Sequence, residues 1–315
     1  MIREAYFFME TNLLRLKYLR VRTLCFYFAA FYLICQSSQA ELRIDVTQGR
    51  ADPMPIAVTV FKSDEIKNKN IGKKISTVIS ANLERSGLFA PINPKAFLEK
   101  SIEMDLRPQF GNWRVVNAQA MVHGAVTIDA EGRLNVQFRL WDVFAEQQMV
   151  GNAYFTTPKN WRRVAHIISD LIYKRITGED GYFDTRIVYI SESGDSDNRV
   201  KRLAIMDQDG ANHRFLTDGS YLVLTPRFSP NSQKITYMSY VNRNSPRVYI
   251  FDIETGKQQI VGEFPGMTFA PRFSPDGNKI VMSYTDPDIG NSEIYILDLK
   301  TRISKRVTNS SAIDV

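Results

Sequence analysis

A five-residue motif occurs twice in this chain and constrains its fold more than any other feature. Pro-Arg-Phe-Ser-Pro occupies residues 226–230 and again residues 271–275, an offset of 45 residues. Each copy leads into two short apolar strand patterns, and the second pattern ends at an aspartate, Asp252 or Asp298. Four short strands in roughly every 40–45 residues are typical of the blades of a β-propeller. The second half of the chain is therefore predicted to consist of blades.

Strand patterns predict three blade-like units in the region from residue 181 to residue 315. The units span residues 186–218, 223–262 and 268–309, and the first has no Phe-Ser-Pro strand before it. Because a propeller closes with about four to eight blades, three units predict an open ring. The sequence therefore favours a chain that stops short of a full propeller or forms one part of a split one.

The repeated side chains have expected positions. The motif phenylalanines, Phe228 and Phe273, are expected to pack between neighbouring blades. The aspartates at the strand ends, Asp207, Asp252 and Asp298, are expected to accept hydrogen bonds from the turn backbone. The run Asp-Gln-Asp-Gly that begins at Asp207 resembles part of a calcium loop, but the later ligands of an EF-hand are missing. We interpret it as a turn.

The first 40 residues have the order of a secretory signal peptide. Basic residues precede an apolar run at residues 24–34, and small residues flank a predicted cleavage between Ala40 and Glu41. The run has 11 residues, whereas a membrane-spanning helix needs about 20, so no span is expected after cleavage. Both cysteines, Cys25 and Cys35, lie in this segment, and the mature chain is expected to have no disulfide or thiol site.

Two features of this segment leave alternatives open. Cys35 could be a lipidation site, but Ile34 stands before it where such a site has a small residue. The chain could begin at Met1 or at Met9.

Residues 53–180 are predicted to form an α+β domain, with helices on one face of a small sheet. Ser63 and Asp64 are expected to cap the first helix, in which apolar residues recur at three- and four-residue steps. The predicted strands are residues 55–61, 120–128, 134–140 and 149–155, and the predicted helices are residues 71–83, 97–98, 112–117 and 161–176.

The first mature segment alternates polar and apolar residues, with Leu42, Ile44 and Val46 on one side. This period of two predicts a strand over residues 41–49. A short strand at a free terminus can pair within its own domain or add to the exposed sheet edge of a partner. Residues 41–52 are therefore a candidate partner-binding segment.

Several kinds of chemistry find no support in the sequence. The net charge is +6, and +3 without the first 40 residues, which is too mild to favour nucleic acid as a partner. Neither His123 nor His166 has a second ligand at metal-binding spacing, so both are interpreted as structural or surface histidines. No phosphate loop or nucleophile elbow is present, and no cofactor, metal site or catalytic residue is predicted.

Several stretches together resemble the TolB family of the bacterial Tol-Pal envelope system. They include residues 41–49, 55–58 and 139–144, and the Phe-Ser-Pro-Asp-Gly repeat. The most specific is residues 163–189, with Arg-Val-Ala-His-Ile-Ile-Ser-Asp and Gly-Tyr-Phe-Asp-Thr-Arg-Ile-Val-Tyr. The resemblance covers residues 41–315. It implies a non-enzymatic periplasmic adaptor with an α/β domain and a six-bladed propeller, which serves envelope integrity and outer-membrane constriction during cell division.

The resemblance also implies partners. The mature N-terminus would bind the C-terminal domain of the inner-membrane protein TolA, and the propeller would bind the lipoprotein Pal; other outer-membrane proteins are possible partners. The implied TolA-binding residues are Glu41, Leu42, Arg43, Ile44, Asp45, Val46, Thr47, Gln48 and Gly49. The implied Pal-binding residues are Met267, Thr268, Phe269, Ala270, Pro271 and Arg272, with Thr225, Pro226 and Arg227 from the equivalent loop.

An enzyme is the alternative, because similar propellers occur in prolyl-oligopeptidase-like peptidases and in sugar lyases. A peptidase would need a downstream hydrolase domain with its nucleophile elbow. A lyase would need a histidine and metal cluster in the channel, and the repeats contain one histidine, His213. The sequence favours the adaptor.

Overall fold

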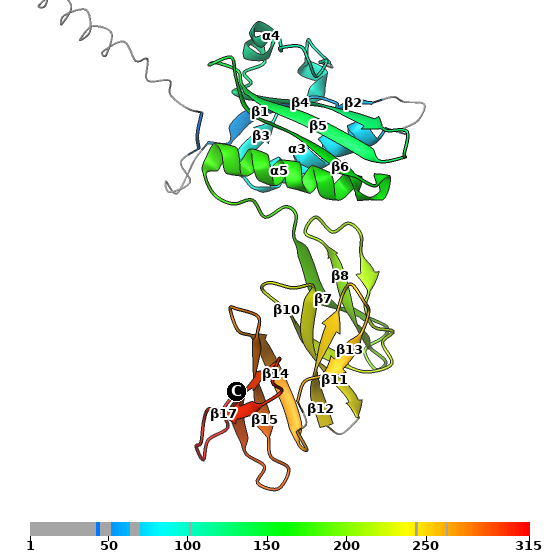
Figure 1. Ribbon diagram of the computed structural model, residues 1–315, viewed down its shortest axis with the longest axis vertical. Coiled ribbons are helices and arrows are strands. Elements are labelled where there is room, and N and C mark those ends of the chain that lie inside the picture. The colour runs from blue at the N-terminus through cyan, green and yellow to red at the C-terminus, as the bar shows by residue number, and fades with distance from the viewer. Residues whose placement is uncertain (1–41, 45–51, 64–69, 101, 243–244, 263) are drawn as a thin grey trace, which may run out of the picture.

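The computed structural model describes residues 42–44, 52–63, 70–100, 102–242, 245–262 and 264–315. An α/β region is followed by separate antiparallel sheets that do not close into a ring (Figure 1). The predicted fold class, an α+β domain followed by a partial propeller, is confirmed. The predicted signal peptide, its cleavage site and Asp45–Gly49 lie outside the described residues.

The α/β region is built on one mixed sheet. The strand β1 (Met54–Val58) pairs in parallel with both of its neighbours, and the last three strands of the sheet form an antiparallel meander. The strand order is β3 (Phe89–Pro91), β1, β4 (Ala120–Ile128), β5 (Leu134–Asp142) and β6 (Gln147–Thr156), with β2 (Lys62–Ser63) paired to β4.

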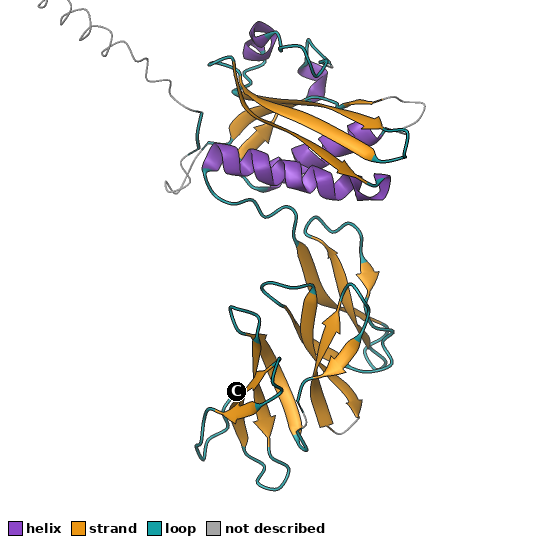
Figure 2. Ribbon diagram, viewed as in Figure 1, coloured by secondary structure: helices purple, strands orange, loops and turns teal. Residues whose placement is uncertain are grey.

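Two long helices, α3 (Ile71–Arg85) and α5 (Trp161–Thr177), cover one face of this sheet (Figure 2). Their apolar stripes meet the alternate residues of β5 in one core, whose fully buried members include Ile75, Ile79, Ile168, Ile172, Leu134 and Val136. None of the helices among the described residues is long and apolar enough to cross a membrane.

The opposite face is covered as well, which corrects the prediction of helices on one face only. The helix α4 (Phe110–Val115) and the 3₁₀ turn η1 (Pro94–Ala96) lie there, and Trp113 is completely buried. This second core exists because alternation along β4 and β5 puts Met121 and Trp141 on that face. Apolar side chains on both faces require two covering layers.

Three local predictions are wrong. Ser63 does not cap α3 but belongs to β2, and α3 begins at Ile71 after Asn70, whose φ is 66°; Asp64 is outside the described residues. Phe97 follows η1 in extended backbone, where its ring packs edge-on against Trp113 at 5.1 Å. The helix expected at residues 112–117 is α4, which begins and ends two residues earlier.

The second half of the chain forms three antiparallel sheets, which we call blades one, two and three. Each strand pairs with the next along the chain, as expected of a propeller blade. Blade one is β7 (Arg186–Ser193), β8 (Val200–Asp207) and β9 (Arg214–Phe215). Blade two is β10 (Val223–Phe228), β11 (Lys234–Asn242), β12 (Ser245–Asp252) and β13 (Gln258–Ile260). Blade three is β14 (Met267–Phe273), β15 (Lys279–Thr285), β16 (Ser292–Asp298) and β17 (Ser304–Arg306).

The motif phenylalanines lie between blades, as predicted. Phe228 packs on a core that contains Leu203 of blade one and Tyr237 of blade two. Phe273 packs on a core that contains Ile250 of blade two and Met282 of blade three.

The strand-end aspartates divide into two kinds. Asp252 accepts hydrogen bonds from two turn N–H groups, and Asp298 does the same one blade later, as predicted. The prediction for Asp207 is wrong, since its carboxylate accepts from the side chain of Asn212. The backbone of that turn is bonded by Asp209 instead, through the Ala211 N–H at 3.0 Å.

Candidate functional sites

The described part of the N-terminal segment lies at the carboxyl end of α5. The Ile44 N–H donates to the Ile176 carbonyl at 3.0 Å, and the Ile44 side chain is buried in the main core. Leu42 packs on the same core, while Arg43 is exposed. The predicted strand is wrong for residues 42–44, which have no regular secondary structure. Carbonyls in the last turn of a helix have no partner within the helix. The Ile176 carbonyl can therefore accept a hydrogen bond from Ile44 without any strand pairing.

The loops expected to face Pal share an unusual backbone. Thr225 and Ala270, at the same position of blades two and three, both have φ of 50°. The ladder register shifts at each, between Leu224 and Arg227 and between Phe269 and Arg272. Left-handed backbone is rare outside glycine, above all for a β-branched residue. The prolines that follow them are the sequence signal for these bulges, because proline cannot donate to a ladder.

The side chains of these loops fall into two groups. Thr268 is buried and its hydroxyl accepts from the Val248 N–H at 2.9 Å, and Pro271 is buried too. The hydrogen bond of Thr268 holds blade two to blade three. The exposed residues, which a partner could touch, are Thr225, Arg227, Met267, Ala270 and Arg272.

Arg247 on β12 positions the chain just before this loop of blade three. Its guanidinium donates to three successive carbonyls, those of Phe264, Pro265 and Gly266. Nothing in the local sequence indicated this role, because the donor and acceptors are about 20 residues apart.

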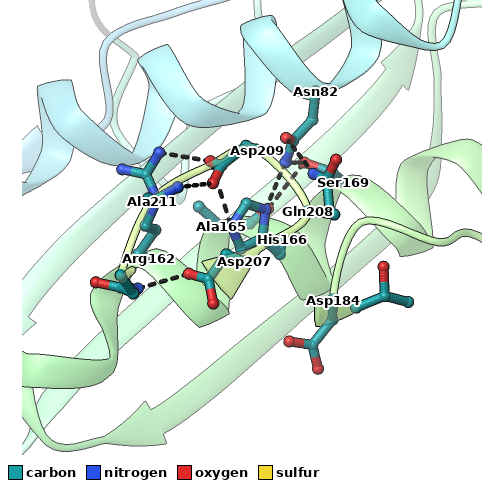
Figure 3. A network of polar contacts seen from close by, with 12 residues as sticks. Asn82, Arg162, Ala165, His166, Ser169, Asp184, Asp207, Gln208, Asp209 and Ala211 are labelled. Carbon is teal, nitrogen blue, oxygen red and sulfur yellow. Dashed lines mark hydrogen bonds and ion pairs between the residues drawn. The ribbon is translucent and has the colours of Figure 1, made fainter. Parts of the chain in front are cut away.

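A polar cluster joins the α/β domain to blade one (Figure 3). Arg162 on α5 pairs with Asp209 at 2.5 Å, and Asn82 on α3 bonds Gln208 at 3.2 Å. Between them lies the His166 ring, whose Nε2 is 3.6 Å from an Asp209 carboxylate oxygen. The sequence shows no ligand at metal-binding spacing from His166, but the fold brings Asp207 and Asp209 of the other domain close to it. We call Asn82, Arg162, His166, Gln208 and Asp209 the junction cluster.

His123 is also buried, within the sheet of the α/β domain. Burial is the main cause that lowers the pKa of His123 to about 4. Its ring is therefore neutral near pH 7, as suits a structural histidine.

Comparison with known proteins agrees with this architecture. An α/β domain followed by propeller blades defines a two-domain propeller protein. Residues 42–149 match the model of the TolB amino-terminal domain, and residues 173–315 match that of the TolB beta propeller domain. The chain is a TolB-like protein, with both of these domains in the order in which the family has them.

Solved structures support the same assignment. TolB from Acinetobacter baumannii is 28% identical with a TM-score of 0.68, and the match covers 84% of this chain and 62% of that one. The chain thus spans less than two thirds of that TolB. The propeller domain of the Trilobed protease from Pyrococcus furiosus is 16% identical (TM-score 0.33, 40% of each chain). An oligogalacturonate lyase from Vibrio parahaemolyticus is 14% identical (TM-score 0.33, 56% of this chain and 44% of that one). These two similarities are too weak to carry a functional conclusion.

Proposed function

We propose that this chain is a periplasmic adaptor of the Tol-Pal system, without catalysis, which links TolA of the inner membrane to the lipoprotein Pal of the outer membrane. Such a link would serve envelope integrity and outer-membrane constriction during cell division. The observation that carries the proposal is the match to both TolB domains, in order, along one chain. The alternative, a piece of a peptidase or lyase, has no comparable support.

The TolA-binding segment of the proposal is Glu41–Gly49. Its described part is held by one backbone hydrogen bond and by the side chains of Leu42 and Ile44. A net hydrogen bond contributes about 0.5–1.5 kcal/mol. A contact of this size can be exchanged for pairing with the sheet edge of a partner. The proposal therefore treats docking on α5 and binding to TolA as competing states.

The Pal-binding surface of the proposal is the pair of loops at Thr225–Arg227 and Met267–Arg272. Their support is the left-handed backbone at Thr225 and Ala270. Strained backbone persists where the surrounding structure enforces it, and it is concentrated at functional sites. The exposed guanidinium groups of Arg227 and Arg272 would reach carboxylates on the lipoprotein.

A peptide competition tests the TolA assignment. A synthetic peptide of residues 41–52 is expected to displace the protein from the immobilised TolA C-terminal domain, while a scrambled peptide of the same composition does not. Equal displacement by both peptides, or by neither, would remove the segment from the proposal.

A further inference from the structure

The hydrogen bonds of the junction cluster fix the orientation of the Asn82 amide. The Ser169 hydroxyl donates to the Ala165 carbonyl at 2.8 Å, so it can only accept from Asn82 Nδ2, which lies 3.0 Å away. On its other side, Asn82 Oδ1 accepts from Arg85 at 2.7 Å and from Gln208 at 3.2 Å. A reversed amide would break all three of these contacts.

This orientation also fixes the tautomer of His166. Asn82 Nδ2 lies 2.9 Å from His166 Nδ1. An amide nitrogen only donates, so Nδ1 must accept, and the hydrogen of the neutral ring is on Nε2. That N–H points toward Asp209, at 3.6 Å, and finds no hydrogen-bond partner among the described residues. The ring is 3% exposed, so water does not readily replace the missing partner.

The same geometry argues against a metal ion here. Potential ligand atoms of His166, Asp207 and Asp209 lie within 4.8 Å of one another. A histidine ligates through a nitrogen that carries no hydrogen, and Nε2 carries one. The Arg162 guanidinium, 2.5 Å from the Asp209 carboxylate, already supplies the positive charge.

We propose that His166 is an acid-sensitive latch, which holds the α/β domain against blade one when neutral and releases it when a proton binds Nδ1. Protonation would turn the acceptor of the Asn82 amide into a donor, so two N–H groups would face each other. The Asn82 amide cannot rotate away from the ring without losing its hydrogen bond with Gln208, which joins α3 to blade one. The contact between α3 and blade one would therefore break. This inference does not depend on the proposed partners.

The charges around the ring act in both directions. The imidazolium form is favoured by Asp207 and Asp209 of blade one and by Asp184 of the linker, residues 178–185 between α5 and β7. It is opposed by Arg162 of α5. Several charged groups near the ring also have other partners. Asp184 pairs with Arg163, Asp170 accepts from the N–H groups of Phe183 and Asp184, and Arg85 of α3 donates to Asn82.

Burial outweighs these charges and lowers the pKa of His166 below its ordinary value. In an opened junction the ring is solvated and has the ordinary value of about 6.5. The closed state then binds fewer protons than the open state below that pH. Closure is thus favoured fully above about pH 6.5 and is weakened as the pH falls below it. If one proton binds His166 in the open state and none binds it in the closed state, lowering the pH from 7.5 to 5.0 raises the ratio of open to closed protein by at most about 30-fold.

Distance measurement between the two domains tests the latch. Spin labels are attached through Lys95→Cys on η1 and Lys300→Cys after β16, both exposed positions, with Cys25 and Cys35 changed to serine. The protein is expected to show one narrow distance distribution at pH 7.5 and a growing population of longer distances at pH 5.0. His166→Gln, which cannot titrate, should abolish the pH dependence, while His213→Gln, at an exposed histidine, should retain it.

The three histidines of the chain also allow a direct reading by NMR. The imidazole signal of His166 is assigned by its loss in His166→Gln. It should titrate together with the change in distance, at a pH below that at which an ordinary solvated histidine titrates. Opening in His166→Gln equal to that of the unchanged protein would overturn the latch. So would titration of His166 with no change in distance, or a shorter distance at pH 5.0. If His166→Gln does not fold, the His166 signal is assigned by elimination instead, from the signals lost in His123→Gln and in His213→Gln, and its titration is compared with the change in distance.

Discussion

At the scale of the residue, the loops of blades two and three are held in a conformation that their side chains disfavour. Thr225 and Ala270 have left-handed backbone, and each stands immediately before the proline of the repeated motif. Left-handed backbone costs a non-glycine residue about 1–2 kcal/mol. The neighbouring ladders must supply that energy, together with the buried Thr268 and Pro271 in the case of Ala270.

Ala270→Gly should therefore stabilise the protein by up to about 1 kcal/mol, because glycine adopts this φ without steric cost but loses more entropy on folding. Ala204→Gly on β8, where φ is not left-handed, is the control and should destabilise it by about 0.5–1 kcal/mol. Urea unfolding measures both. If Ala270→Gly destabilises as much as the control, the backbone at Ala270 is not strained.

Gly181 is a second residue whose identity is set by its neighbour. A Cβ at this position would lie 2.5 Å from the Cα of Asp170 on α5. Gly181→Ala must push the linker off the helix, and we expect a loss of about 1–3 kcal/mol in the free energy of unfolding. Gly111→Ala on α4 has open space around it and should be neutral or slightly stabilising. Equal effects of the two changes would show that the linker does not rest on α5.

At the scale of the element, α5 connects three parts of the molecule. Its amino-terminal turns contact blade one through Arg162 and His166, its middle forms the main core, and its last turn bonds Ile44. The helix itself was predictable, because its apolar residues recur at three- and four-residue steps. Its contacts with blade one were not, since Asp209 lies 47 residues beyond Arg162 and belongs to another domain.

The blades depend on each other through the motif phenylalanines. Phe273→Ala removes a ring from the core shared by blades two and three, and we expect a loss of about 2–3 kcal/mol, below the 3–5 kcal/mol of a fully buried ring. Phe215→Ala on β9, 49% exposed, is the matched control and should cost less than about 1 kcal/mol. Thermal unfolding followed by circular dichroism compares them. Equal costs would contradict the role of Phe273 between blades.

At the scale of the whole molecule, the sequence was most informative where its pattern was periodic. The 45-residue repeat predicted the blades and the positions of Phe228 and Phe273. The period of the repeat did not predict the bulges at Thr225 and Ala270, whose signal in the sequence is the proline that follows each of them. Nor could it predict the junction cluster, whose members combine α3, α5 and blade one. The fold was thus largely accessible from the sequence, whereas contacts between domains were not.

The adaptor proposal is tested most directly by calorimetric titration of the protein with the TolA C-terminal domain. Deletion of residues 41–52 is expected to abolish binding. The double variant Arg227→Ala, Arg272→Ala, which alters only the loops assigned to Pal, is expected to bind TolA with unchanged affinity. Binding by the deletion variant at the affinity of the full chain would contradict the account.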